Sequence, residues 1–305
     1  LVNMGDHEQK SQELRLNGDN GNFNWVAGLY VLTENNVTDF ANGTLNTTTG
    51  NITVAADRTM VNGLDTTAAY FQGDIKFADR WTATLGLRYT EETKDFYIDR
   101  NPGAAGAALS SAAIQAAGIP LELEEQVWTP RVALNFALND DVSFFVSSTN
   151  GFKSGGWPAR ATSNVAFIPF KPEKIWSHEV GLRGQFLDNT LRLNVTGFYS
   201  VTDDIQIPAR IDVNGLQIST TTNPADLKNR GIEVDAQWAP NEQFSMTLGL
   251  GNQKAEYENI AAVVLAQAAA CRANPAAQFN GAPACNANFV DQFGTCLQER
   301  IVIAN

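Results

Sequence analysis

Strict alternation of apolar and polar residues recurs along most of this chain and constrains its fold more than any other feature. In WTATLGLRY the apolar side chains from Trp81 to Tyr89 share one face, and in IWSHEVGLRGQF those from Trp176 to Phe186 follow the same rule. The segments LRLNVTGFY, IEVDAQW and FSMTLGLG repeat the pattern. A period of two residues indicates strands with one apolar and one polar face. The sequence therefore predicts an all-β protein.

The alternating segments predict about ten strands joined by connections of two kinds. We expect the strands at 8–17, 23–34, 65–77, 81–96, 127–138, 142–153, 174–187, 190–207, 216–238 and 243–258, with an eleventh starting at Arg300. Short turns alternate with long connections, which cover 35–64, 97–126, 154–173, 208–215 and 259–299. Since consecutive antiparallel strands place alternate connections at opposite ends, we expect one tight end and one elaborate end. Ala-rich runs at 104–118 and 260–273 favour short helices within the loops.

The spacing of the aromatic residues distinguishes a membrane barrel from a soluble sandwich. One set brackets the short turns, and a second set lies eight to ten residues further along the same apolar faces, at Tyr89, Trp128, Trp176 and Tyr199. Eight strand steps of ~3.3 Å, tilted by roughly 40°, rise about 20 Å, close to the ~25 Å apolar band between two aromatic girdles. A soluble sandwich also alternates, but it has no reason to space its aromatic residues in this way. We therefore predict an antiparallel up-and-down transmembrane β-barrel.

The polar faces of the predicted strands carry charges that are unfavourable in contact with lipid. A wet or plugged lumen suits them, so we expect these residues to face it: Arg88, Arg131, Glu179, Arg183, Glu233 and Asp235. Such charges more often pair with each other or with a plug than bind substrate. Both interpretations stay open at this point.

Composition and cysteine usage exclude several other classes of protein. The net charge is -12, and no basic stripe is present, which argues against a nucleic-acid partner. No phosphate loop or nucleophile–base set occurs, so we expect neither an enzyme nor a cofactor. Cys271, Cys285 and Cys296 share one polar stretch, which predicts a surface-loop disulfide whose pairing the sequence does not decide. Their spacing lacks the ligand pairs of a metal site.

Four segments resemble, in the family's order, the barrel strands of TonB-dependent outer-membrane receptors. They are GDIKFADRWTATLGLRYTEETKDF, SSTNGFKSGGWP, FKPEKIWSHEVGLRGQF and NRGIEVDAQWAP, and the likeness runs from Glu8 to Tyr257. The resemblance implies a plugged 22-stranded barrel in the bacterial outer membrane, of which this chain supplies about 10–11 strands. We expect residues 1–305 to be a partial barrel domain, with the N-terminal plug domain and the final strands not present in this chain.

The resemblance also implies active uptake of a scarce ligand, such as a ferric siderophore or a similar chelate. The lipid bilayer and the TonB energy-coupling complex, reached through the absent N-terminal region, are the implied partners. A passive porin or specific diffusion channel is the alternative. In GFKSGGWPAR we predict ligand contacts at Lys153, Trp157 and Arg160, with cations for an anionic chelate and an aromatic ring for stacking. The alternative is structural: glycines with positive φ and Trp157 anchored at the outer interface.

Overall fold

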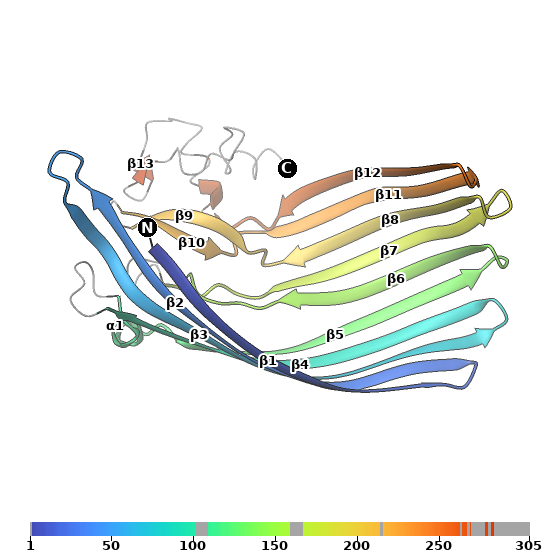
Figure 1. Cartoon of the computed structure of the whole chain (residues 1–305), viewed down its shortest axis with the longest axis horizontal. Coiled ribbons are helices and arrows are strands. Elements are labelled where there is room, and N and C mark those ends of the chain that lie inside the picture. Colours follow the sequence, from blue (N-terminus) through green and yellow to red (C-terminus); the bar gives the residue numbers. More distant parts are fainter. Residues whose placement is uncertain are drawn as a thin grey trace.

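A single antiparallel sheet of ten strands dominates the computed structural model, which describes residues 2–101, 109–158, 167–213, 216–262, 264–266, 269, 278–279 and 282–283 (Figure 1). The strands of this sheet, in spatial order, are β1 (Val2–Asp19), β2 (Phe23–Leu45), β3 (Ile52–Ala78), β4 (Trp81–Arg100), β5 (Glu122–Ala137), β6 (Val142–Lys153), β7 (Glu173–Phe186), β8 (Leu191–Asp203), β11 (Asp226–Asn241) and β12 (Phe244–Glu258). Other elements are the helix α1 (Ser111–Ala116), the hairpin of β9 (Ile207–Val213) and β10 (Leu216–Thr222), and the short pair β13 (Gln278–Phe279) and β14 (Ala282–Pro283).

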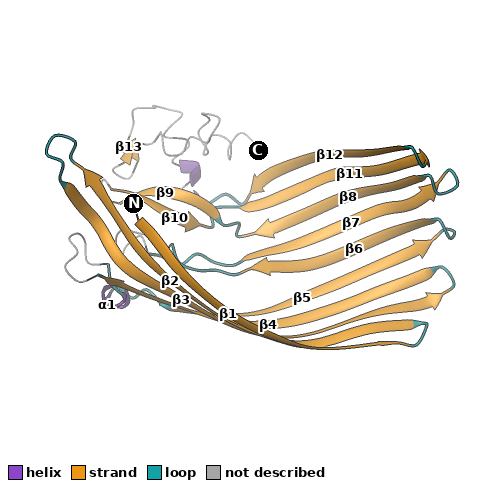
Figure 2. Ribbon diagram, viewed as in Figure 1, coloured by secondary structure: helices purple, strands orange, loops and turns teal. Residues whose placement is uncertain are grey.

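The sheet is a meander in which each strand pairs with the next, apart from the β9–β10 hairpin inserted between β8 and β11. Short turns gather at one end and the long connections at the other (Figure 2). The predicted tight and elaborate ends are therefore confirmed. Among the described strands β1 and β12 each have a neighbour on one side only, so the sheet is open, as expected of an incomplete barrel wall. No helix in the described part of the chain is both long and apolar enough to cross a membrane.

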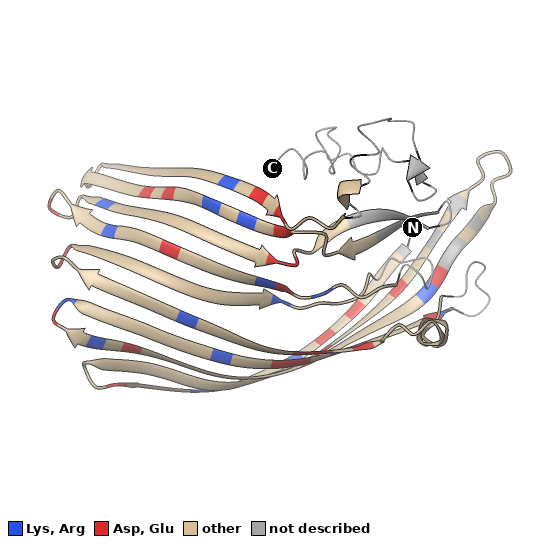
Figure 3. Cartoon of the chain, turned by 180° about the vertical axis from the view of Figure 1, so that it is seen from behind, with Lys and Arg blue, Asp and Glu red and all other residues tan. Residues whose placement is uncertain are grey.

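The predicted loop at 35–64 is wrong, because β2 and β3 continue as a long hairpin up to a turn at Asn46–Asn51. Strands of 23 and 27 residues far exceed the ~9–11 residues that cross a bilayer. Their upper parts therefore extend beyond the hydrocarbon, and acidic residues recur along this extension (Figure 3). Polar cross-strand bonds, such as Thr33 Oγ1 to Asp65 Oδ1 at 2.7 Å, replace apolar rows there. Without a continuous apolar row toward lipid, the alternation that identifies a strand disappears.

The predicted single strands at 190–207 and 216–238 are also wrong, because each is interrupted. Asp204 has a φ of +51°, a left-handed conformation that ends β8. Pro224 precedes β11 and has no N–H to donate to a sheet. Residues 208–213 of the predicted loop 208–215 lie in β9. The Ala-rich run at 104–118 does contain a helix, α1, capped by Ser110, whereas the strand predicted at Arg300 and the three cysteines lie outside the described residues.

One face of the sheet carries the two predicted rows of aromatic rings. Near the short turns, Trp81 lies 6.4 Å from Phe77 and 4.6 Å from Phe136 between ring centroids. Further up the strands, the rings of Tyr89 and Trp128 lie 4.8 Å apart. The second row continues through Trp176, His178 and Tyr199, whose rings follow one another at 6.2 and 6.3 Å. Exposed aliphatic side chains fill the band between the rows, including Leu85, Leu87, Val146 and Val180.

Close packing on the opposite face depends on glycines beneath aromatic rings. Phe145 of β6 covers Gly181 of β7, where an added Cβ would meet the ring at 2.6 Å and the Val195 carbonyl oxygen at 2.6 Å. Tyr70 of β3 covers Gly28 of β2 in the same way, with a ring carbon 2.4 Å from the site of a Cβ. Such pairs let neighbouring strands approach while the ring fills the space that glycine leaves.

Candidate ligand-binding mouth

A small hydrophobic core lies at the end of the sheet that carries the long loops. It joins the extended strands β3 and β4 to α1 and to the connection after β6, and its buried members are Met60, Phe96, Ile98, Leu109, Ile114, Trp157 and Phe167. The register pairs Met60 with Ile98, on the same face as Tyr70 and Arg88 and opposite the aromatic rows. Two amides of β4 donate into the covering loop, Phe96 N to the Leu121 carbonyl (2.9 Å) and Ile98 N to Ser111 Oγ (2.8 Å). These loops are therefore packed onto the barrel wall.

Trp157, predicted as a stacking contact for the ligand, lies inside this core. Its side chain is 8% exposed, and its ring centroid is 5.7 Å from that of Phe96. Nε1 donates to the Pro120 carbonyl oxygen at 2.8 Å. The ring thus offers no open face to a ligand in this arrangement, and it is not part of the outer aromatic rows either. Trp157 holds the connection after β6 against the loop before β5.

The glycines of the GFKSGGWP run have a role other than the predicted positive φ, since neither Gly155 nor Gly156 has one. Gly156 pairs with Phe170 through two backbone hydrogen bonds of 3.2 and 2.8 Å. A Cβ on Gly155 would lie 2.5 Å from the Phe170 carbonyl oxygen, so only glycine fits this close approach. Lys94 Nζ donates to the Gly155 carbonyl at 2.9 Å. Contacts with Phe170 and with Lys94 therefore hold the segment that follows β6 in place.

Lys153 ends β6 directly opposite Glu173, the first residue of β7. Its Nζ is 3.7 Å from Glu173 Oε1, and its side chain is 63% exposed. Lys171 lies in the same loop root, with Nζ 3.1 Å from Asp204 Oδ1 and a side chain that is 70% exposed. Both lysines keep donors that are open to solvent. Arg160, the third predicted contact, lies outside the described residues.

Sequence reasoning missed the polar network that holds these lysines in place. Gln206 Nε2 donates to the carbonyls of Ser154 and Lys171 at 2.9 and 3.1 Å. Asn223 brackets the Lys171 backbone, accepting from its N–H at 2.8 Å and donating to its carbonyl at 3.1 Å. The connections after β6, β8 and β10 are thereby joined. The Asn-Pro pair at 223–224 is a turn signal that points to Asn223, whereas Gln206 carries no such signal.

Strand register places all six predicted lumen charges on the face opposite the aromatic rows. The Arg88 guanidinium lies 5.6 Å from the centre of the Tyr30 ring and 5.9 Å from that of Tyr70, whose hydroxyl donates to Glu13 at 2.6 Å. Arg183 lies over Phe145 at 4.3 Å. Within the described part of the chain, Arg131, Glu179, Glu233 and Asp235 have no ion-pair partner within 4.0 Å. Most of the six predicted charges therefore have no ion-pair partner among the described residues of this sheet.

Comparison with known protein families identifies the family of barrels to which this sheet belongs. Residues 3–283 match the model described as TonB dependent receptor-like, beta-barrel. The chain belongs to this family. TonB-dependent receptor barrels lie in the outer membrane, so the aromatic and aliphatic face meets lipid and the polar face turns inward. The family consists of receptors and transporters, not enzymes. No group of three or more His, Cys, Asp or Glu among the described residues is arranged to hold a metal ion.

Individual relatives are receptors and transporters of which this chain resembles a part. A metal-pseudopaline receptor, CntO, of Pseudomonas aeruginosa is 24% identical over 136 residues, which is 45% of this chain and 17% of that receptor. The pesticin receptor of Yersinia pestis is 26% identical over 108 residues, 35% of this chain and 15% of that receptor. Among solved structures, the ferric yersiniabactin uptake receptor FyuA of Yersinia pestis superposes with a TM-score of 0.64 at 19% identity, covering 84% of this chain and 36% of FyuA.

The copper transporter OprC gives a TM-score of 0.63 at 16% identity, covering 84% of this chain and 39% of OprC. These two structural matches establish the fold. The chain spans less than two-fifths of the length of either structure.

Proposed function

We propose that this TonB-dependent receptor barrel belongs to a transporter that takes up a scarce metal chelate, such as a ferric siderophore, by energy-coupled transport. The family membership supports transport, and relatives that are named for ferric yersiniabactin, metal-pseudopaline and copper support a metal-bearing cargo. The observation that carries the proposal for this chain is the mouth, where two exposed lysines lie at a loop root that is held by hydrogen bonds from Gln206 and Asn223.

Lys153 and Lys171 are suited to an anionic ligand because each keeps ammonium donors in solvent. Lys153 lies on the inward-facing side of β6, since its register partner Glu173 shares that side with Ser177 and Glu179. The bonds from Gln206 and Asn223 hold the backbone of Lys171, so less conformational entropy is lost when an anion binds. Positive charge at a cleft entrance also raises the local concentration of an anionic ligand.

The inward face below the mouth provides a path of polar side chains. In this proposal Arg88, Arg131, Glu179, Arg183, Glu233 and Asp235 line the lumen and contact either a plug or the passing ligand. The energy-coupling complex acts through the N-terminal region of the whole protein, outside this chain. A disulfide among Cys271, Cys285 and Cys296 would brace a surface loop, and Arg160 would add a cation near Lys153.

Uptake of labelled ferric siderophores by cells that carry the full-length gene tests this proposal. Import is expected to require the energy-coupling complex, and deletion of that complex is expected to abolish it while binding at the surface persists. Uptake that continues at the same rate without the complex would show a passive channel instead. Uptake of no metal chelate in a broad panel, with energy-dependent import of another solute, would refute the cargo class alone.

A further inference from the structure

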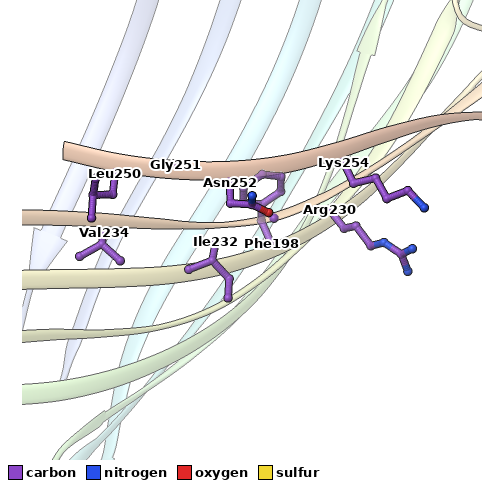
Figure 4. A pocket seen from close by; sticks show the side chains of 9 residues that line it. Phe198, Arg230, Ile232, Val234, Leu250, Gly251, Asn252 and Lys254 are labelled. Atoms are coloured by element: carbon purple, nitrogen blue, oxygen red, sulfur yellow. The ribbon is translucent and has the colours of Figure 1, made fainter.

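A hollow of about 740 Å³ lies on the lipid-facing side of the sheet, across β8, β11 and β12 (Figure 4). Its lining includes Arg230, Ile232 and Val234 of β11 and Leu250, Asn252 and Lys254 of β12. Strand register places these residues beside three residues of β8 in rows that run from the loop end downward: Tyr199–Arg230–Lys254, then Gly197–Ile232–Asn252, then Val195–Val234–Leu250. Gly197 has no side chain, so the middle of the hollow stays open. The upper row is cationic and the lower row is apolar.

The upper aromatic girdle indicates the level of the cationic row in the membrane. Tyr199 begins this row, and its ring lies 6.3 Å from His178, which stacks on Trp176. Aromatic girdles mark the level of lipid headgroups. Arg230 and Lys254 therefore lie at the phosphate level of a bilayer leaflet, and Val234 lies four residues, or about 13 Å, deeper along the strand.

Arg230 and Lys254 retain hydrogen-bonding capacity despite a neighbouring carboxylate. Glu256 Oε2 is 3.3 Å from Arg230 Nη2, and Glu256 Oε1 is 2.7 Å from Lys254 Nζ. One carboxylate thus serves two cations, whose side chains remain 54% and 60% exposed. A guanidinium has five N–H donors and an ammonium three, so most donors stay free. Both side chains extend to the same side of the hollow (Figure 4).

We infer that this hollow binds a phosphorylated glycolipid of the outer leaflet. Its phosphate contacts Arg230 and Lys254, and one acyl chain lies along Ile232, Val234 and Leu250. The cations lie at headgroup level, directly above apolar side chains that are 56% exposed at Ile232 and 58% exposed at Leu250. This combination favours a lipid over a free anion. A soluble anion would gain nothing from the apolar rows, and an uncharged lipid nothing from the cations. The site lies on the outer, lipid-facing surface of the barrel wall, and the inference does not depend on the proposed cargo.

Binding of bis-phosphorylated lipid A to the full-length protein in detergent, measured by native mass spectrometry, tests this inference. The Arg230→Gln/Lys254→Gln double variant is expected to bind about thirtyfold more weakly, because each basic residue near an anionic headgroup contributes a factor of about five. The matched control is Arg183→Gln/Arg192→Gln, the same charge change on the inward face of β7 and β8, which should leave affinity unchanged. Equal weakening in both double variants would overturn the proposal.

Three further measurements distinguish lipid binding from simpler explanations. Glu256→Gln frees both cations, so it is expected to strengthen lipid A binding. If the cluster were only a self-contained salt-bridge network, Glu256→Gln would lower stability without raising affinity. Inorganic phosphate at millimolar concentration is expected to compete poorly, since it lacks acyl chains. Full displacement by phosphate, or unchanged affinity after Leu250→Ser, would show an anion site that does not recognise a lipid.

Discussion

Replacement of Trp157 by alanine tests whether this residue is a structural anchor or a ligand contact. The ring is almost completely buried against Phe96, and its Nε1 donates to Pro120. Truncation of a buried tryptophan to alanine costs about 3–5 kcal/mol, and loss of the hydrogen bond alone costs about 1 kcal/mol. Trp157→Phe keeps most of the apolar contact, so it should cost only the smaller amount.

Hydrogen exchange at two β4 amides measures this loss directly. Phe96 N and Ile98 N donate to Leu121 and Ser111 in the covering loop, so both exchange when the loop lifts. A loss of 3–5 kcal/mol in the free energy of local opening speeds their exchange by about 150- to 5000-fold, and Trp157→Phe by about fivefold. The matched control is Trp128→Ala, an exposed tryptophan on the lipid-facing side, which should leave these amides unchanged.

The opposite pattern would refute the reasoning. If Trp157→Ala left exchange at Phe96 and Ile98 within twofold of the unmodified protein, the ring would not be holding the loop. If the same variant also weakened ligand binding at unchanged loop protection, Trp157 would be a binding residue after all. The sequence-based prediction would then be restored.

Three other substitutions test the packing of the barrel wall and the role of the lysines at the mouth. Gly181→Ala places a methyl group 2.6 Å from Phe145 and from the Val195 oxygen, and such overpacking should destabilise the refolded full-length barrel by about 1–3 kcal/mol. Gly197→Ala, whose nearest new contact is 3.7 Å away, should be neutral, and equal denaturation midpoints for the two would contradict the packing account. Lys153→Gln and Lys171→Gln should each weaken binding of an anionic ferric chelate by about 1.5- to fivefold at low salt. Lys76→Gln at the tight-turn end should not change it, and equal loss in all three would exclude a specific role for the mouth lysines.

The strands that cross the membrane could be predicted from the sequence because hydrocarbon imposes one chemistry on one face. From Trp81 to Leu87 every second residue must be apolar, and the same rule locates β5 to β8. This rule does not apply to the parts of the strands that extend beyond the membrane. The upper halves of β2 and β3 meet no lipid, so Thr59 bonds to the Asp39 carboxylate and nothing in the sequence separates such a strand from a polar loop.

The candidate site was less predictable because it depends on contacts between residues far apart in the chain. Lys153 could be placed at a strand exit from local pattern alone. Burial of Trp157 depends on Phe96, about sixty positions earlier, and on loop residues that carry no periodic signal. The Gly155–Phe170 approach likewise joins the two ends of the long connection between β6 and β7, so the glycines resembled an ordinary flexible turn.

A nitroxide scan along β6 tests the central claim, that one face of this sheet meets hydrocarbon and the other an aqueous interior. Labels would be placed singly from Phe144 to Thr149 in the full-length protein in outer membranes, with the native cysteines replaced by serine. The account predicts that labels at Phe144 and Val146 collide with lipid-soluble oxygen, and that labels at Phe145 and Ser147 collide with a water-soluble nickel chelate. Equal accessibility at successive positions, or protection of Phe144 and Val146 from both reagents by packed protein, would contradict it.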